Sequence, residues 1–299
     1  MPPLLGALLA VILWGVSFVA TRAALGELQP VTLIAVRFAI GDMMLFAMLA
    51  ARRMPLLPPR REWPVMALLG FDGIALHTMI QAYALRETTA VRTGWLIGLS
   101  PIWSAILAAI FLRERLGWIK SLGLGIGFAG AVIVVTRGAI SGQTPALPGT
   151  RGDLLILAST FNWAIYTVIS REPVRRVGSL PAMAAAMLVG CLLLLPWFLA
   201  SHAWRELSRM SPMGWGAVLF LGIGCSGIAY LLWFGAIERI DASRVSALLY
   251  IEPLVTLAAA VLLLHEPVLI STIVGGLLVL AGVALVQAAP HSRRQPIRS

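Results

Sequence analysis

The sequence predicts an all-α integral membrane protein of ten transmembrane helices, arranged as two inverted five-helix repeats with both termini in the cytoplasm. Apolar residues make up 59% of the chain and charged residues only 12%, whereas a soluble domain carries about 25% charge. The mean hydropathy is +0.90. Two further observations support this fold class: a series of apolar segments long enough to span a bilayer, and an internal repeat.

The apolar segments follow one another with short polar breaks between them. Each contains about 20 residues, the length that an α-helix needs to cross a hydrocarbon core of about 30 Å. Arg, Pro and Gly mark the breaks, as in Arg52-Arg53-Met54-Pro55. The expected spans, in order, are 4–25, 31–51, 63–85, 93–112, 117–136, 153–170, 181–200, 213–237, 243–264 and 268–288.

The second half of the chain repeats the first. Residues 63–134 align with residues 215–286 without a gap, at an offset of 152 positions. This alignment pairs identical residues: Arg92 with Arg244, Pro101 with Pro253, Glu114 with Glu266, Gly123 with Gly275 and Gly130 with Gly282. A duplicated membrane unit is the usual ground plan of a secondary transporter.

The repeat divides the chain into four parts. Residues 1–137 form the first five-helix repeat and 153–288 the second; 138–152 are an extracytoplasmic linker rich in Gly, Pro, Ser and Thr, and 289–299 a basic cytoplasmic tail. Five spans are an odd number, so the second copy enters the membrane from the opposite side. An inverted pair of this kind can open to either side in turn, which is the basis of alternating access.

The distribution of basic residues predicts the orientation. With the N-terminus in the cytoplasm, fifteen of the 23 Lys and Arg lie inside, seven lie outside, and Arg37 lies within a span. The positive-inside rule therefore places both termini in the cytoplasm. The same rule accounts for the net charge of +10, so we expect no nucleic-acid partner. The first span lacks the basic region and cleavage site of a removable signal peptide.

Small residues recur in the fifth and tenth spans, at Gly123, Gly127 and Gly130 and at Gly275, Gly276 and Gly282. Such rows let helix backbones approach one another, so we expect tight helix packing or a dimer seam there. The two cysteines, Cys191 and Cys225, lie inside spans and are interpreted as small apolar fillers, with no metal site or disulfide expected.

The repeated pattern resembles the drug/metabolite transporter superfamily, in particular its ten-helix EamA-type members, over residues 4–288. Each half has a Pro in its fourth span, an acidic residue at the end of that span and a Gly-rich fifth span; Pro30 followed by Arg37-Phe38 also fits. The resemblance implies a central cavity lined by the first, third, fourth, sixth, eighth and ninth helices, with export of solutes such as aromatic amino acids. His265-Glu266-Pro267 departs from the family pattern, and we interpret Glu114 and Glu266 as residues that cap a helix or orient the following helix.

Ionisable side chains within a span are costly, about 2.5 to 3.5 kcal/mol each on insertion scales, so each needs a partner or a cavity. Glu252 lies near the middle of the ninth span, beside Pro253, and could bind a proton, a cation or an ammonium group, or be a buried neutral or paired Glu. His77 is either a cavity donor or a satisfied core histidine. We interpret Arg37 and Asp42 as structural, and leave Asp72 open.

Aromatic and polar residues form stripes at helical spacing on the first, third, sixth and eighth spans. Together they predict a semi-polar wall that can stack on apolar parts of a solute and hydrogen-bond its polar ends. The predicted substrate-binding residues are Trp14, Ser17, His77, Gln81, Ser100, Asn162, Trp163, Tyr166, Tyr230, Trp233, Tyr250 and Glu252, with Pro101 and Pro253 as gating or kink positions.

The chain has no phosphate-binding loop of the form G-x-x-x-x-G-K-[ST], so ATP-driven pumping by this chain alone is excluded. We expect a secondary carrier without catalytic residues or cofactors, in the bacterial inner membrane, that exports small amphipathic metabolites such as apolar or aromatic amino acids. Its partners are the small-molecule substrate, the lipid bilayer and protons as a coupling ion. A carrier of purines, sugars or amines, a channel and an intramembrane enzyme are the alternatives; substrate, coupling and oligomeric state stay open.

Overall fold

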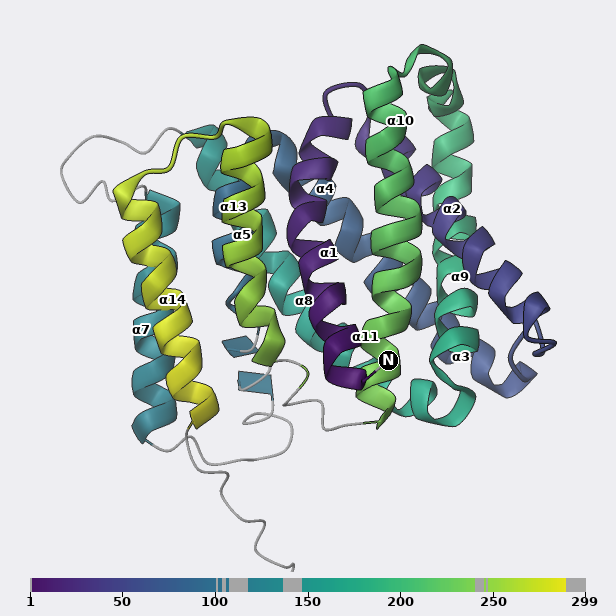
Figure 1. The fold of residues 1–299 in the computed structure, drawn as a ribbon, viewed down its shortest axis with the longest axis horizontal. Helices are drawn as coiled ribbons and strands as arrows, with labels where there is room; N and C mark the ends of the chain where they lie inside the picture. The colour runs from purple at the N-terminus through teal and green to yellow at the C-terminus, as the bar shows by residue number, and fades with distance from the viewer. Residues whose placement is uncertain are drawn as a thin grey trace, which may run out of the picture.

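The structure is a computed structural model, and it describes residues 2–100, 102–103, 106–107, 118–136, 147–239, 245 and 247–288. Within these ranges all the regular structure is helical. The helices form an elongated bundle and run roughly parallel or antiparallel to one another (Figure 1). The turn between α1 and α2 lies at the end of the bundle opposite to the N-terminus, and we call this the α1–α2 end.

In the first half, a long helical stretch is interrupted by a wider π-helical segment. The elements are α1 (Pro3–Ala24), α2 (Pro30–Ala51), η1 (Arg60–Glu62), α3 (Trp63–Leu69), η2 (Gly70–Leu76), α4 (His77–Glu87), α5 (Ala90–Ile97) and α7 (Trp118–Thr136). Of these, η1 is a 3₁₀ helix and η2 is the π-helical segment.

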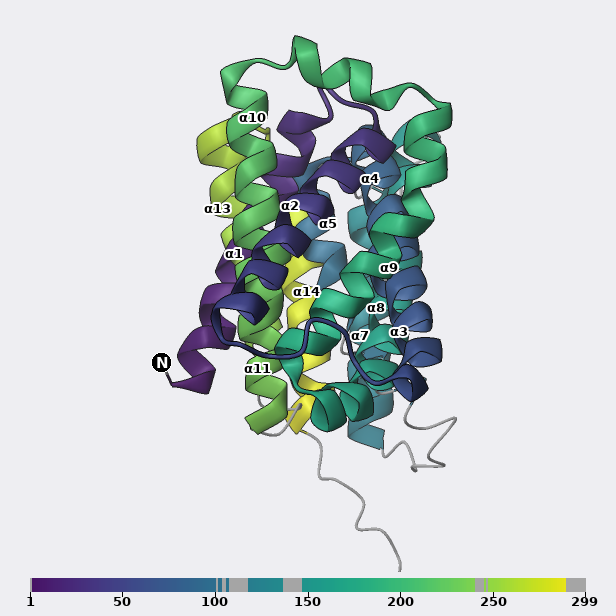
Figure 2. The same ribbon diagram turned by 90° about the vertical axis from the view of Figure 1, so that its right-hand side faces the viewer.

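The second half has the same plan. Its elements are α8 (Leu147–Val177), α9 (Ser179–Ala200), η3 (Ala203–Arg209), α10 (Pro212–Leu219), η4 (Phe220–Ala229), α11 (Tyr230–Arg239), η5 (Ala247–Ile251), α13 (Glu252–Leu264) and α14 (Ile270–Ala288). The segment η4 is π-helical, while η3 and η5 are 3₁₀ helices. Figure 2 shows the η3 segment crossing the α1–α2 end between α9 and α10.

Several helices have the length and composition of membrane spans. Five helical stretches meet both criteria: Pro3–Ala24, Pro30–Ala51, Arg60–Glu87, Ser179–Ala200 and Pro212–Arg239. Large apolar side chains on their outer faces are exposed, for example Leu192 and Leu199 on α9, as expected where a helix faces lipid. The count of ten spans, the inverted arrangement and the cytoplasmic termini stay predictions.

The start of α8 differs from the sequence prediction. The helix begins at Leu147, inside the expected linker 138–152, and not at residue 153. Gly152 allows this first part of α8 to contact the end of α4, because a Cβ at Gly152 would lie 2.9 Å from the Ala84 carbonyl oxygen. The next residue, the fully buried Asp153, forms an ion pair with Arg92 and accepts a hydrogen bond from Thr88 Oγ1 at 2.5 Å.

The two π-helical segments occupy corresponding positions in the two sequence halves. Gly70 begins η2, and Gly222, its partner at the 152-residue offset, lies in η4. Each packs against a helix of the other half. A Cβ at Gly70 would lie 2.9 Å from the Gly190 nitrogen of α9, and one at Gly222 would lie 3.0 Å from the Arg37 carbonyl oxygen of α2. Glycine is therefore required for both approaches.

The glycine rows of the predicted fifth and tenth spans pack α7 against α14, which lie side by side at one edge of the bundle (Figure 1). A Cβ on Gly275 would lie 2.7 Å from the Gly130 carbonyl oxygen, and one on Gly282 would lie 2.7 Å from the Gly127 Cα. The rows thus bring two helices of the same chain into backbone contact. This confirms the predicted tight packing without a second chain.

The carboxylate of Glu266 caps a helix. Its two oxygens accept hydrogen bonds at 3.1 Å from the backbone nitrogens of Ala90 and Val91, in the first turn of α5. The expected capping role of Glu266 is therefore confirmed, although the capped helix, α5, belongs to the other half of the chain. Arg22 of α1 also pairs with this carboxylate at 3.2 Å. Glu114 lies outside the described residues.

Candidate functional site

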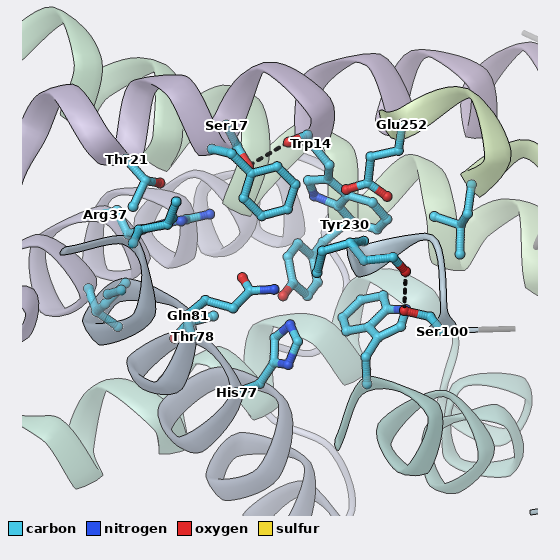
Figure 3. Close-up of a pocket in the computed structure, with 17 residues that line it drawn as sticks. Trp14, Ser17, Thr21, Arg37, His77, Thr78, Gln81, Ser100, Tyr230 and Glu252 are labelled. Carbon is cyan, nitrogen blue, oxygen red and sulfur yellow. Dashed lines mark hydrogen bonds between the residues drawn. The ribbon is translucent and has the colours of Figure 1, made fainter. Parts of the chain in front are cut away.

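A cavity lies between the two halves of the bundle, at the level where α1 passes the start of α13. Its open volume is about 60 Å³. Helices from both halves line it, and Figure 3 shows their side chains converging. The lining residues are Trp14, Ser17, Phe18, Thr21, Ile34, Arg37, His77, Thr78, Gln81, Ala82, Leu85, Ile97, Ser100, Trp163, Tyr230, Leu249 and Glu252.

An aromatic cluster forms one wall of the cavity. The ring of Trp14 packs edge-on against Trp163 at a centroid distance of 5.6 Å and against Tyr230 at 5.4 Å. Trp163 in turn contacts the His77 ring at 5.2 Å. Edge-to-face pairs at these distances are favourable beyond the burial of area, so the rings hold one another in place. The wall is therefore a fixed surface that is apolar with polar edges.

The π-helical segments help to place these side chains. A π-helical turn is wider than an α-helical one and is often found at functional sites. In η4, the Cys225 carbonyl oxygen accepts a hydrogen bond from Trp14 Nε1 at 3.2 Å, which fixes the indole against the second half. His77 and Tyr230 are the residues directly after η2 and η4. Two of the helices that line the cavity, α4 and α11, thus start where a π-helical segment ends.

A close approach of α1 and α13 positions Glu252. A Cβ on Gly15 would lie 2.8 Å from Val255 Cβ, so only glycine permits this contact. Thr256 Oγ1 donates a hydrogen bond to the Gly15 carbonyl oxygen at 2.9 Å. Glu252 begins α13, is only 4% exposed, and forms no ion pair with any described residue. Its carboxylate is therefore buried and faces the cavity.

Arg37, interpreted from the sequence as structural, is the second charged residue of the lining. Its Nε donates a hydrogen bond to Ser226 Oγ in η4 at 3.1 Å, and its guanidinium lies 5.0 Å from the centre of the Phe38 ring. It makes no ion pair with Asp42 or with any other acidic side chain that the structure describes. The interpretation of Arg37 as purely structural does not account for this position.

The structure brings together eight of the predicted substrate-binding residues at the cavity: Trp14, Ser17, His77, Gln81, Ser100, Trp163, Tyr230 and Glu252. Their part in binding stays a prediction. Thr21, which the helical spacing places on the same stripe as Trp14 and Ser17, lines the cavity as well.

Three other predicted residues lie behind the lining. Tyr166 is fully buried, with its ring against Gly73 and Phe234. Trp233 is fully buried and contacts the ring of Trp14. The amide of Asn162 donates a hydrogen bond to Asp72 Oδ1 at 2.7 Å. These residues can support the wall of the cavity but do not contact its open space.

Two of the remaining predicted positions cannot be placed at the cavity. Pro101 lies outside the described residues, and so does the side chain of Tyr250. Pro253 lies in the first turn of α13, directly after the 3₁₀ segment η5. Its missing N–H matters little there, because the first turn of a helix has no partner for that group.

Comparison with known proteins identifies the family. The chain matches the EamA-like transporter family over residues 1–136 and 150–288. The chain belongs to this family. The EamA-like family is part of the drug/metabolite transporter superfamily, which confirms the resemblance found in the sequence and makes this chain a multi-pass membrane transporter.

Relatives of this EamA-like transporter align over nearly their whole lengths. An uncharacterized transporter from Archaeoglobus fulgidus is 30% identical over 286 residues, covering 95% of this chain and 96% of that protein. A protein from Streptantibioticus cattleyicolor, named "Probable terminal-alkyne amino-acid exporter", is 27% identical over 96% of this chain and 94% of its own. One solved crystal structure superimposes with a TM-score of 0.66 at 25% identity, covering 95% of both chains.

Proposed function

We propose that this EamA-like transporter is a secondary carrier that exports amino acids with apolar or aromatic side chains. The observation that carries the proposal is the cavity itself, in which Trp14, Trp163 and Tyr230 form an aromatic wall and polar side chains from both halves complete the lining. An aromatic surface stacks on an apolar side chain, while hydroxyl, amide and charged groups suit the polar end of the same solute.

The small volume of the cavity supports transport by a change of conformation. An open space of about 60 Å³ holds only a few water molecules. A binding site for a metabolite needs roughly 300 Å³ or more. A solute can therefore enter only when helices or side chains move apart, as alternating access between two inverted halves requires.

The direction and the location of transport belong to the same proposal. The Streptantibioticus relative is named as an amino-acid exporter, which supports amino acids as the substrate class and export as the direction. In the proposed arrangement, ten spans form two inverted repeats in a bacterial inner membrane, with both termini in the cytoplasm. The α1–α2 end then faces outward.

Glu252 is the residue that we assign to coupling. A carboxylate near the middle of a membrane protein, buried and without an ion pair among the described residues, can take up a proton or another cation during the transport cycle. We propose that Glu252 binds the coupling proton when the cavity is exposed to one side and releases it on the other.

Transport into proteoliposomes tests this function. The purified protein would be supplied with labelled amino acids, purines, sugars and amines, each with and without a pH gradient. We expect saturable flux of apolar and aromatic amino acids, counter-transport by unlabelled substrate, and acceleration by the gradient. Flux that does not saturate would indicate a channel, selective flux of a purine, sugar or amine would identify another substrate class, and product formation in detergent would indicate an enzyme.

A further inference from the structure

We propose that Arg37 binds the carboxylate of the transported solute and makes a free acid group a requirement for transport. This inference deepens the proposed function and uses the same cavity. Arg37 lies on α2, which begins at Pro30, and its side chain enters the cavity at the end where Thr21 lies (Figure 3).

Among the described residues, most of the hydrogen-bond donors of Arg37 have no partner. A guanidinium has five N–H donors in a fixed planar fork, and in this part of the chain only the Nε–H is paired, with Ser226 Oγ at 3.1 Å. No acidic side chain in the described part of the chain forms an ion pair with it, although the residue is only 8% exposed. A permanently charged group in such surroundings is stabilised by an anionic partner that enters the cavity.

The contacts that Arg37 does make hold the fork in one orientation. Ser226 fixes Nε from the second half of the chain, and the Phe38 ring lies under the guanidinium at 5.0 Å. A guanidinium fixed by these two contacts presents its outer N–H groups as a pair. Such a pair matches the two oxygens of a carboxylate, which is the geometry that distinguishes Arg from Lys.

Glu252, the acidic residue of the cavity lining, forms no ion pair with Arg37. Arg37 lies beside Thr21, whereas Glu252 lies beside Trp14 at the other end of the site (Figure 3). In the proposed arrangement the acid group of the solute binds Arg37, its side chain lies along the aromatic wall, and Glu252 binds the coupling cation.

Matched pairs of acids and amides test the inference in proteoliposomes. Each pair has the same side chain and differs only in the acid group: phenylalanine and phenylalaninamide, leucine and leucinamide, and phenylpropionate and phenylpropionamide. The wild-type protein should transport or bind the acid at least tenfold better than the amide. In Arg37→Gln the flux of the acid should fall at least tenfold while that of the amide does not, and Arg37→Lys should lie between the two.

Two further variants serve as controls. Arg175→Gln removes an Arg whose side chain is 58% exposed and lies outside the cavity, so its acid-to-amide ratio should equal that of the wild type. Glu252→Gln should change the response to a pH gradient and leave the ratio high. If the amino acids are not transported but phenylpropionate still depends on Arg37, the proposed substrate class fails and the role of Arg37 stands.

Two results would overturn the inference. One is an unchanged acid-to-amide ratio in Arg37→Gln or Arg37→Lys, measured on protein that elutes as a single folded species in detergent. The other is equal handling of acid and amide by the wild-type protein, which decides the question even where neither variant folds.

Discussion

Replacing Gly275 by Ala should destabilise the protein by separating α7 from α14. The added Cβ would lie 2.7 Å from the Gly130 carbonyl oxygen, 2.9 Å from Val134 Cγ2 and 3.0 Å from the Val134 nitrogen, whereas ordinary contacts begin at 3.4 Å. Two of these three atoms belong to the backbone, so they cannot rotate away, and the helices must move apart by roughly 0.7 Å. Overpacking of this kind costs about 1 to 3 kcal/mol.

Gly125 provides the matched control on α7. A Cβ at Gly125 would meet none of the described atoms of neighbouring segments within 4 Å, so Gly125→Ala keeps the packing, and both variants share the same gain in helix propensity of up to about 1 kcal/mol. The two variants should therefore differ by the overpacking cost alone, about 1 to 3 kcal/mol in the free energy of unfolding. Reversible unfolding of the purified proteins in mixed micelles, followed by circular dichroism, measures this difference.

Equal stability of Gly275→Ala and Gly125→Ala would refute the reasoning. A change of oligomeric state in Gly275→Ala without a change in stability would also refute it, because the glycine row would then be a seam between two chains. Size-exclusion chromatography with light scattering, carried out on the same samples, separates these outcomes.

Three other predictions concern the site and the loops. Trp163→Ala should reduce transport at least tenfold, because it removes the ring between Trp14 and His77. The control is Trp118→Ala, since Trp118 is 75% exposed. Normal flux in both variants would show that Trp163 is not part of the site. Glu252→Gln should abolish the dependence of transport on a pH gradient, and an unchanged pH profile would show that this carboxylate is only structural. Glu27 lies in the loop between α1 and α2, and hydrogen bonds from Ser211 Oγ and N hold the pKa of its carboxyl below its ordinary value. Because the folded-state pKa is the lower one, this contact stabilises the protein above the unfolded-state pKa of about 4.3 and the contribution is lost as the pH falls below it. The melting temperatures of wild type and Glu27→Ala should therefore converge between pH 6 and pH 3, and a constant difference would contradict the assignment.

The repeat and the apolar spans allowed much of the fold to be predicted, because both are visible along the chain. The glycine rows are an example: their spacing is local, and the structure places Gly130 and Gly275 in backbone contact as expected. The packing partner of Glu266 was not predictable in this way. Its carboxylate caps a helix that begins 176 residues earlier in the chain, and no local pattern indicates such a partner.

The candidate site shows the same limit. Regular helical spacing placed Tyr166 on the cavity wall, but it could not anticipate the wide turn of η2 or the space beside Gly73 that receives the Tyr166 ring. Arg37 was assigned a structural role because a long side chain near the end of a span can snorkel to the interface or form a pair. Its position depends on Ser226, which is 189 residues away. Contacts between distant segments decide which side chains reach the cavity.

The π-helical segments have a consequence for how the chain can be divided. The segment η2 packs its Gly70 against α9, and η4 packs Gly222 against α2. Each half of the sequence therefore covers a glycine-containing helix surface of the other half. The boundary between the two sequence copies is therefore not a boundary between two folding units. Either half produced alone would expose the glycine-lined surface that its counterpart covers, and the two should accumulate in a membrane only when they are made together.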